Sequence, residues 1–201
     1  MGKLIKRKLN KQMEYLGHFL FEVVKITILG FIYSTILFFI YKNLPKNKKP
    51  EWCEKWLKSK NILWLLISFI LFVHMFTPYG NHGLGDSARI PITFTKEISN
   101  VNWTEYGSLN GIKSTEGNDI EVTLFKVENN CIYGNLNSGF YDYKNAYFIY
   151  DIETDNLKEF ITEKEYNEYV TAKNLPKSNE LKSFTENYRK YWSGWRFFLL
   201  P

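Results

Sequence analysis

A serine nucleophile with a histidine base is the first catalytic arrangement that this sequence could contain. Ser87 lies in the stretch Gly85-Asp86-Ser87, and the possible bases are His18, His74 and His82. Nucleophilic catalysis by serine needs a base positioned beside the hydroxyl. All three histidines precede the serine, and the nearest, His82, lies in the same expected turn region. A serine–histidine pair would have to use His82, five residues before Ser87 in one turn region, so we do not expect this chemistry.

A phosphate-binding turn is the second possibility. Residues 83–88, Gly-Leu-Gly-Asp-Ser-Ala, have the G-x-G-x-x-A spacing of a dinucleotide-binding turn. Such a turn works between a strand and a helix, because the helix N-terminus meets the pyrophosphate. Here an apolar run precedes the stretch and Pro91 soon follows it. We interpret the stretch as a flexible turn beside a membrane.

Metal and acid–base chemistry are limited by the composition of the polar part of the chain. Residues 88–201 contain no histidine and one cysteine, Cys131. A zinc site of the usual ligands is therefore not expected there, and we predict no metal and no cofactor. A pair of carboxylates could still serve a glycosidase. Such residues are usually solvated, so the pattern favours a non-enzymatic protein and leaves an enzyme open. The carboxylates on or near expected strands are Asp119, Glu121, Asp142, Asp151 and Glu153.

Two apolar runs precede this polar region. As a helix, the 23 residues of Phe19–Tyr41 measure about 35 Å, enough to cross a hydrocarbon core of about 30 Å. Ile62–Thr77 has 16 residues, which is short for a span, but Trp64 and Tyr79 fit an aromatic belt. The alternative, that one run is a buried core helix, is disfavoured because both are rich in Ile, Leu and Phe.

These runs predict the domain organisation of the N-terminal region. We expect a basic tail at 1–18 and a transmembrane hairpin over 19–77. Its spans are 19–41 and 62–77, joined by a Lys-rich loop at 42–61.

Three ionisable residues lie within the expected spans. Glu22 and Lys25 are three residues apart, so they share one helix face and can pair. Lys25 has two interpretations: its side chain snorkels to the interface, or the pair is an intramembrane feature kept for function. His74 is either a contact histidine at the interface or between the helices, or a proton relay.

Charge divides the chain into a basic and an acidic part. Residues 1–77 carry a net charge of +9, and residues 78–201 carry −4. Nucleic-acid binding needs a basic patch on the folded domain, so we predict no nucleic-acid partner. The basic residues suit anionic lipid headgroups. The basic N-terminal tail favours a cytoplasmic domain by the positive-inside rule, since two spans put both ends of the chain on one side. Because the loop is denser in Lys and residues 78–88 lack Lys and Arg, we favour the alternative, an extracytoplasmic domain of a multi-pass plasma (inner) membrane protein.

The polar region predicts an α+β domain over 88–201, after a juxtamembrane linker at 78–87. We expect a small antiparallel sheet with a strand at Ala88–Glu97 and two hairpins. The hairpins are 119–127 with 131–135, and 147–152 with 157–161. Thr162-Glu163-Lys164-Glu165 is a capping box, which begins a helix that runs to about residue 173. A second late helix covers 179–191, and the apolar end of the chain packs on the domain core.

Aromatic residues supply the candidate binding sites. Exposed Tyr and Trp are prone to form interfaces. Tyr141 and Tyr143 follow Gly139 in a polar stretch, and Trp192, Trp195 and Arg196 form a second cluster near the end of the chain. Core packing is the alternative role for these residues.

Two stretches resemble known sequences. Residues 83–92 (GLGDSARIPI) and the ending 191–201 (YWSGWRFFLLP) are similar to uncharacterised two-span membrane-anchored proteins of Bacteroidota-type bacteria. The resemblance covers residues 78–201 and implies a bacterial membrane protein, without an activity or site residues.

These observations lead to two hypotheses about function. The first is a membrane-anchored, non-enzymatic binding protein of the bacterial envelope, of an accessory or immunity type, with the lipid bilayer and a protein as partners. The alternative is a ligand-sensing membrane effector whose helical hairpin oligomerises and disrupts the bilayer. In that case Glu22, Lys25 and His74 line the assembly.

Overall fold

The protein consists of two compact units. A computed structural model describes residues 2–45, 59–83, 87–136 and 141–201. One unit, here called the helical unit, comprises Met1–Gly85 and Gly194–Pro201, and the other, the sheet domain, comprises Asp86–Ser193. The predicted Lys-rich loop lies largely outside the described residues.

Helix α1 (Gly2–Asn43) is the longest element of the helical unit. Its segment Tyr15–Asn43, of 29 residues, is the one described helix long and apolar enough to cross a membrane, and it measures about 44 Å. The expected basic tail is part of this helix, because α1 already begins at Gly2. One side of α1 exposes large apolar side chains, among them Phe21, Val24 and Ile28. This composition indicates membrane association.

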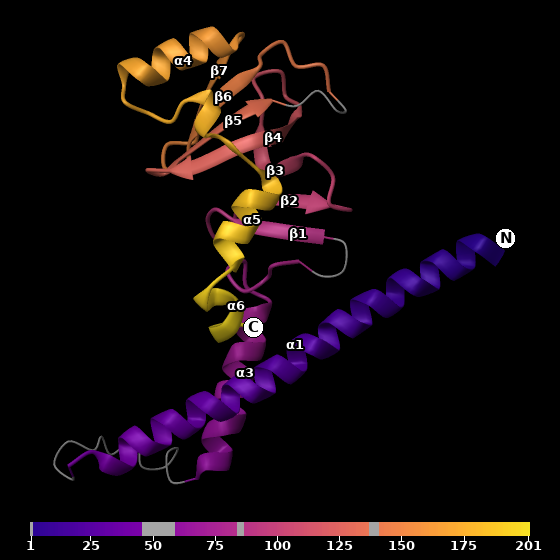
Figure 1. Cartoon of the computed structure of the whole chain (residues 1–201), viewed down its shortest axis with the longest axis vertical. Coiled ribbons are helices and arrows are strands. Elements are labelled where there is room, and N and C mark those ends of the chain that lie inside the picture. Colours follow the sequence, from indigo (N-terminus) through magenta and orange to yellow (C-terminus); the bar gives the residue numbers. More distant parts are fainter. Residues whose placement is uncertain (1, 46–58, 84–86, 137–140) are drawn as a thin grey trace. The chain divides into compact units, whose positions relative to one another are not determined.

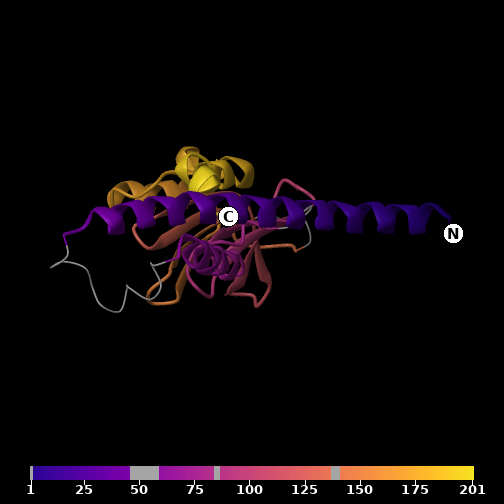
Figure 2. The same cartoon turned by 90° about the horizontal axis from the view of Figure 1, so that it is seen from below.

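Helix α3 (Lys60–Met75) is apolar but has 16 residues, so it measures about 24 Å and is shorter than the hydrocarbon core. The predicted transmembrane hairpin is therefore not confirmed, since one of its two helices meets the length of a span. Figure 1 and Figure 2 show α3 crossing α1 rather than running along it.

A small apolar contact joins α1 to α3. Ile26 and Leu29 of α1 are buried against Leu71 and Met75 of α3. Close by, Gly30 lies against Ser68, because a Cβ there would lie 2.2 Å from the Ser68 hydroxyl and 3.3 Å from the Ser68 Cα. Small residues allow such close approach of two helices.

The end of the chain belongs to the helical unit and not to the sheet domain. Helix α6 (Trp195–Leu199) follows Gly194, whose φ of +66° suits a residue without a Cβ. The Tyr33 hydroxyl of α1 donates a hydrogen bond to the Leu199 carbonyl at 2.5 Å. The prediction that this segment packs on the sheet core is therefore wrong, because a helix broken at Gly194 docks on α1 instead.

The sheet domain is an antiparallel meander in which each strand pairs with its neighbours in sequence (Figure 1). A two-residue strand, β8 (Lys182–Ser183), pairs with Leu124 and Phe125 of β4. This architecture agrees with the predicted α+β class. The seven strands of the meander are β1 (Ser87–Pro91), β2 (Glu97–Val101), β3 (Gly107–Lys113), β4 (Asp119–Glu128), β5 (Cys131–Leu136), β6 (Tyr147–Asp151) and β7 (Asn156–Phe160).

Turn residues explain the two hairpins that the sequence predicts. Asn129 and Asn130 join β4 to β5 with φ of +50° and +57°, the left-handed conformation that a tight hairpin turn needs and that Asn tolerates. Asp155 does the same between β6 and β7, with φ of +55°. Both predicted hairpins are confirmed.

Strand β4 is the centre of the sheet. It pairs with β5 on one side, and with β3 and β8 on the other. Its register to β5 shifts between Val122 and Phe125. There the Asn135 side-chain oxygen accepts hydrogen bonds from the amides of Thr123 and Leu124, at 3.2 and 2.7 Å. The side chain thus satisfies amides that the irregular pairing leaves without a strand partner.

Two helices cover opposite faces of the sheet. In β6, Phe148 and Tyr150 pack in the core that includes Phe184 of α5 (Phe184–Trp192), whereas Tyr147 and Ile149 pack with α4 (Glu163–Ala172). This follows from the alternation of side chains along a strand. The capping box at Thr162 is confirmed.

The second late helix differs from its predicted bounds. The predicted segment 179–191 divides into a short 3₁₀ turn at Ser178–Glu180, strand β8 and helix α5. The reason is a second capping box, in which Ser183 accepts from the Glu186 amide and Glu186 accepts from the Ser183 amide. The box ends the preceding strand and begins the helix at Phe184.

Candidate functional site

A buried carboxylate in the helical unit is the centre of the candidate site. The side chain of Glu22 on α1 is 3% exposed. Its Oε1 lies 3.3 Å from His82 Nε2 and 3.8 Å from His18 Nε2, while its Oε2 lies 3.8 Å from Lys25 Nζ. The imidazole rings of His18 and His82 lie 5.2 Å apart. We call these four residues the Glu22 cluster.

Helix geometry brings three members of the cluster together. Residues three and four apart lie on one helix face, so His18 and Lys25 both reach Glu22 from within α1. A buried charge is costly unless it is paired. The basic and imidazole groups around Glu22 therefore make the burial of its carboxylate tolerable.

A tight turn after α3 supplies the fourth member. The Gly80 and Asn81 amides both donate to the Thr77 carbonyl, and the Thr77 hydroxyl donates to the His74 carbonyl. A Cβ on Gly80 would lie 2.1 Å from the His74 carbonyl oxygen, so this turn needs glycine. The chain then returns toward α1.

His82 follows this turn. Just beyond it, the Gly83 amide donates to the Asn81 side-chain oxygen at 3.1 Å, an Asx-type contact that holds the local backbone. The turn as a whole carries the His82 imidazole to within hydrogen-bonding distance of Glu22.

Two of the four residues of this cluster, Glu22 and Lys25, are predicted from the sequence. The predicted pairing of Glu22 with Lys25 agrees with their 3.8 Å separation. His74, predicted as the third ionisable residue of the spans, lies against Gly80 and outside the cluster. His18 was not predicted, although its position four residues before Glu22 places both side chains on one helix face. His82 gave no such signal, because its approach depends on the fold.

The first predicted aromatic cluster is built into the domain surface. The rings of Tyr141 and Tyr143 lie 5.9 Å apart. The Tyr143 hydroxyl donates to the Asp119 carbonyl and accepts from the Glu121 amide. Burial raises the pKa of Tyr143 to about 12. Tyr143 therefore has a structural role in addition to any role in binding.

The second predicted aromatic cluster is divided between the two units. Trp192 is not exposed as expected, because its ring is buried and its indole nitrogen donates to the Arg89 carbonyl at 2.6 Å. Trp195 belongs to the helical unit and is 61% exposed. The Arg196 guanidinium lies 5.5 Å from its ring, within the range of a cation–π contact.

A further exposed aromatic residue lies in the turn between β2 and β3. Trp103 is 51% exposed and has a φ of +52°, next to Asn102 with +59°. The buried Asn100 side chain holds this turn, because its amide nitrogen donates to the carbonyls of Thr104 and Tyr106 at 2.9 and 2.6 Å. We call residues 101–104 the Trp103 turn.

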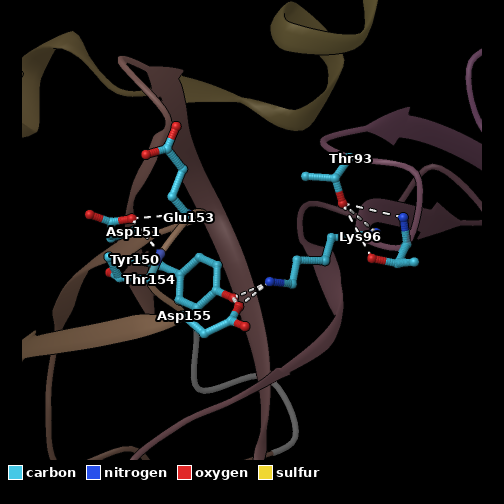
Figure 3. Close-up of polar contacts among 8 residues, drawn as sticks. Thr93, Lys96, Tyr150, Asp151, Glu153, Thr154 and Asp155 are labelled. Carbon is cyan, nitrogen blue, oxygen red and sulfur yellow. Dashed lines mark hydrogen bonds and ion pairs between the residues drawn. The ribbon is translucent and has the colours of Figure 1, made fainter.

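A polar cluster at the opposite end of β2 joins two hairpins (Figure 3). Lys96 Nζ donates to the Tyr150 hydroxyl at 2.6 Å and to the Asp155 carboxylate, which also accepts from Tyr150. The Thr93 hydroxyl accepts from the Lys96 amide at 3.1 Å, so the turn itself positions the lysine. The hydrogen bond from Lys96 lowers the pKa of the Asp155 carboxyl. This cluster fastens the β1–β2 turn to the β6–β7 turn.

Comparison with known proteins adds no relative. No protein-family model, curated protein or solved structure matches the chain. The resemblance to two-span bacterial membrane proteins stays a prediction, and the interpretation of function depends on the residues themselves.

Proposed function

We propose that the protein is a membrane-anchored, non-enzymatic binding protein of the bacterial envelope. In this proposal α1 holds the chain in the bilayer, and the sheet domain binds a protein partner through the Trp103 turn. The apolar segment Tyr15–Asn43 and the separate core of the sheet domain support this division of roles.

The conformation of the Trp103 turn is the observation that carries the proposal. A bulky residue with positive φ is a backbone outlier that costs about 1–3 kcal/mol. Here that residue is a half-exposed tryptophan. Its ring meets the Tyr188 ring edge-on at 5.4 Å, and Asn100 holds the backbone beneath it.

These contacts make the tryptophan rigid before any partner arrives. Rigid aromatic side chains lose little conformational entropy on binding, and tryptophan is enriched among the residues that dominate binding energy. The turn therefore has the properties of a preorganised anchor for a protein surface.

Site-specific photocrosslinking in living cells tests the proposal. A photoreactive residue at Val101, which is 52% exposed, is expected to give a discrete adduct with one protein. The same residue at Lys164, exposed on α4, serves as the matched control and should give none. Trp103→Ala should reduce the Val101 adduct at least about tenfold, the loss typical of an interface anchor, and Trp103→Tyr should restore part of it.

Equal adduct patterns from positions 101 and 164, or an adduct that is unchanged by Trp103→Ala, would contradict the proposal. Turnover of a substrate by the full chain, lost when one carboxylate is replaced, would show instead that the protein is an enzyme.

The proposal includes a topology. We propose that both α1 and α3 cross the plasma membrane and that the sheet domain is extracytoplasmic, as the Lys-rich loop at 42–61 favours. A cysteine placed at Lys164, with Cys53 and Cys131 replaced, should then react with a membrane-impermeant thiol reagent on intact cells. Protection of this cysteine until the cells are lysed would place the domain in the cytoplasm.

A further inference from the structure

We infer that His18, Glu22 and His82 form a binding site for a divalent transition-metal cation of the zinc class. The inference concerns the helical unit alone and does not depend on the proposed binding role of the sheet domain. It also goes beyond the sequence, which predicts no metal site.

The donor set has the right chemistry. Two imidazoles and one carboxylate are a common ligand set of catalytic zinc sites, in which a water occupies the fourth position. Glu22 and His18 lie on adjacent turns of one helix face, as ligands four residues apart do in helical zinc sites. The ligand atoms of His18, Glu22 and His82 all lie within 4.8 Å of one another.

The distances are close to those of a bound ion. Bond lengths of about 2.0–2.2 Å in a tetrahedron place neighbouring donor atoms roughly 3.3–3.6 Å apart. Glu22 Oε1 and His82 Nε2 are already 3.3 Å apart. His18 Nε2 is 3.8 Å from the same oxygen, and the donor atoms of the two histidines lie within 4.8 Å of each other. A rotation of the His18 imidazole that shifts its nitrogen by about an ångström brings the set toward tetrahedral spacing.

The two oxygens of Glu22 have different surroundings. Both imidazoles face Oε1, whereas Lys25 Nζ lies 3.8 Å from Oε2. A cation among His18, Glu22 and His82 would thus bind Oε1, and the ammonium would orient the carboxylate through the other oxygen. Contacts of this kind outside the ligands themselves commonly orient metal-binding side chains.

Space for a fourth ligand adjoins the carboxylate. A cavity of about 40 Å³ is lined by Glu22, Met75, Asn81 and His82, together with Phe76 and the glycines of the turn. A water needs roughly 10–15 Å³ of such volume and at least two polar partners. The cavity therefore has room for the water that an open zinc site keeps.

Zinc binding by the full chain tests the inference. The chain is purified in detergent without a histidine tag, and bound zinc is measured by competition with a chromophoric chelator and by elemental analysis. We expect one zinc ion per chain. Glu22→Gln and His82→Ala should each weaken binding at least about a hundredfold, because loss of an outer contact alone costs about 10–100-fold.

One further variant is a control and another tests the outer contact. His74→Ala removes the remaining histidine, which lies outside the site, and should leave the affinity for zinc unchanged. Lys25→Met removes the ammonium that orients the carboxylate through Oε2, so it should weaken zinc binding about tenfold, less than the loss of a ligand. Loss of binding in His74→Ala with retention in His82→Ala would place the metal elsewhere and overturn the assignment.

A spectroscopic measurement covers the case in which a ligand variant fails to fold. Cobalt(II) added to the unaltered chain should give the intense visible absorption of a tetrahedral site, and zinc should displace it. An unaltered chain that takes up neither ion would overturn the inference without reference to any variant, and would leave the Glu22 cluster as an ion-pair network.

Discussion

Replacing Phe125 by alanine is expected to lower the free energy of unfolding of the sheet domain by about 3–5 kcal/mol, the usual cost of deleting a buried phenylalanine ring. Phe125 is 0% exposed and belongs to the main core, where its ring lies 6.4 Å from that of Phe184. Its backbone pairs with Gly134 of β5 and Lys182 of β8. A cavity there removes packing between the central strands and helix α5.

The loss is large because domains are stabilised by only about 5–15 kcal/mol in total. The change in the free energy of unfolding is measured by hydrogen exchange of the β4 and β5 amides in the full chain, over a series of urea concentrations. Val127→Ala is the matched control on the same strand, since Val127 is 42% exposed and an exposed truncation should stay within about 0.5 kcal/mol. Equal effects of the two substitutions would mean that Phe125 does not lie in the core of the sheet domain.

The parts of the fold that the sequence predicts are those specified by local chemistry. The Asn129–Asn130 and Asp155 turns and the Thr162 capping box each need only a few adjacent residues, so their hairpins and helix were predicted correctly. Strand β3 was missed, because its sequence Gly-Ser-Leu-Asn-Gly-Ile-Lys contains residues depleted in strands. It is held in the sheet by its neighbours β2 and β4.

A turn hidden by β-branched residues explains the error at Ala88–Glu97. The β-branched content of this segment predicts one strand, but the Ile92 amide bonds to the Lys96 carbonyl and closes a turn within it. Lys96 then reaches Tyr150 and Asp155 from the other hairpin. The turn itself is closed locally, since the Thr93 hydroxyl also accepts from the Lys96 amide, but the contacts of Lys96 with the second hairpin are not visible in the sequence.

The same distinction applies to the candidate site. Contacts of Glu22 with His18 and Lys25 follow from spacings of four and three along one helix and are predictable in principle. The contact with His82 spans 60 residues and depends on how α3 ends. The sequence separation of His18 and His82 hides their proximity, which depends on the turn at Gly80.

Gly80→Ala should therefore disrupt the Glu22 cluster without altering any member of it. A Cβ at this position would lie 2.1 Å from the His74 carbonyl oxygen and 2.8 Å from its carbonyl carbon. These are backbone atoms, so no side-chain rotation relieves the overlap, and the turn must open. We expect zinc affinity to fall at least about tenfold, comparable with the loss of a contact that orients a metal ligand.

A second measurement detects the opened turn without any metal. Chymotrypsin should cleave after Tyr79 at least several times faster in Gly80→Ala, because Tyr79 is already 44% exposed and cleavage needs local unfolding of the backbone around it. Gly17→Ala on α1 is the matched control, since a Cβ there meets nothing within 4 Å and alanine favours the helix.

The two readouts separate the turn from the metal. Faster cleavage with unchanged zinc affinity would mean that His82 is not a ligand, although the turn has opened as its geometry requires. Unchanged cleavage would mean that Gly80 does not lie against the His74 carbonyl at the end of α3. If both change in Gly80→Ala and neither changes in Gly17→Ala, the glycine turn is what carries His82 to Glu22, and the site depends on a single close backbone contact.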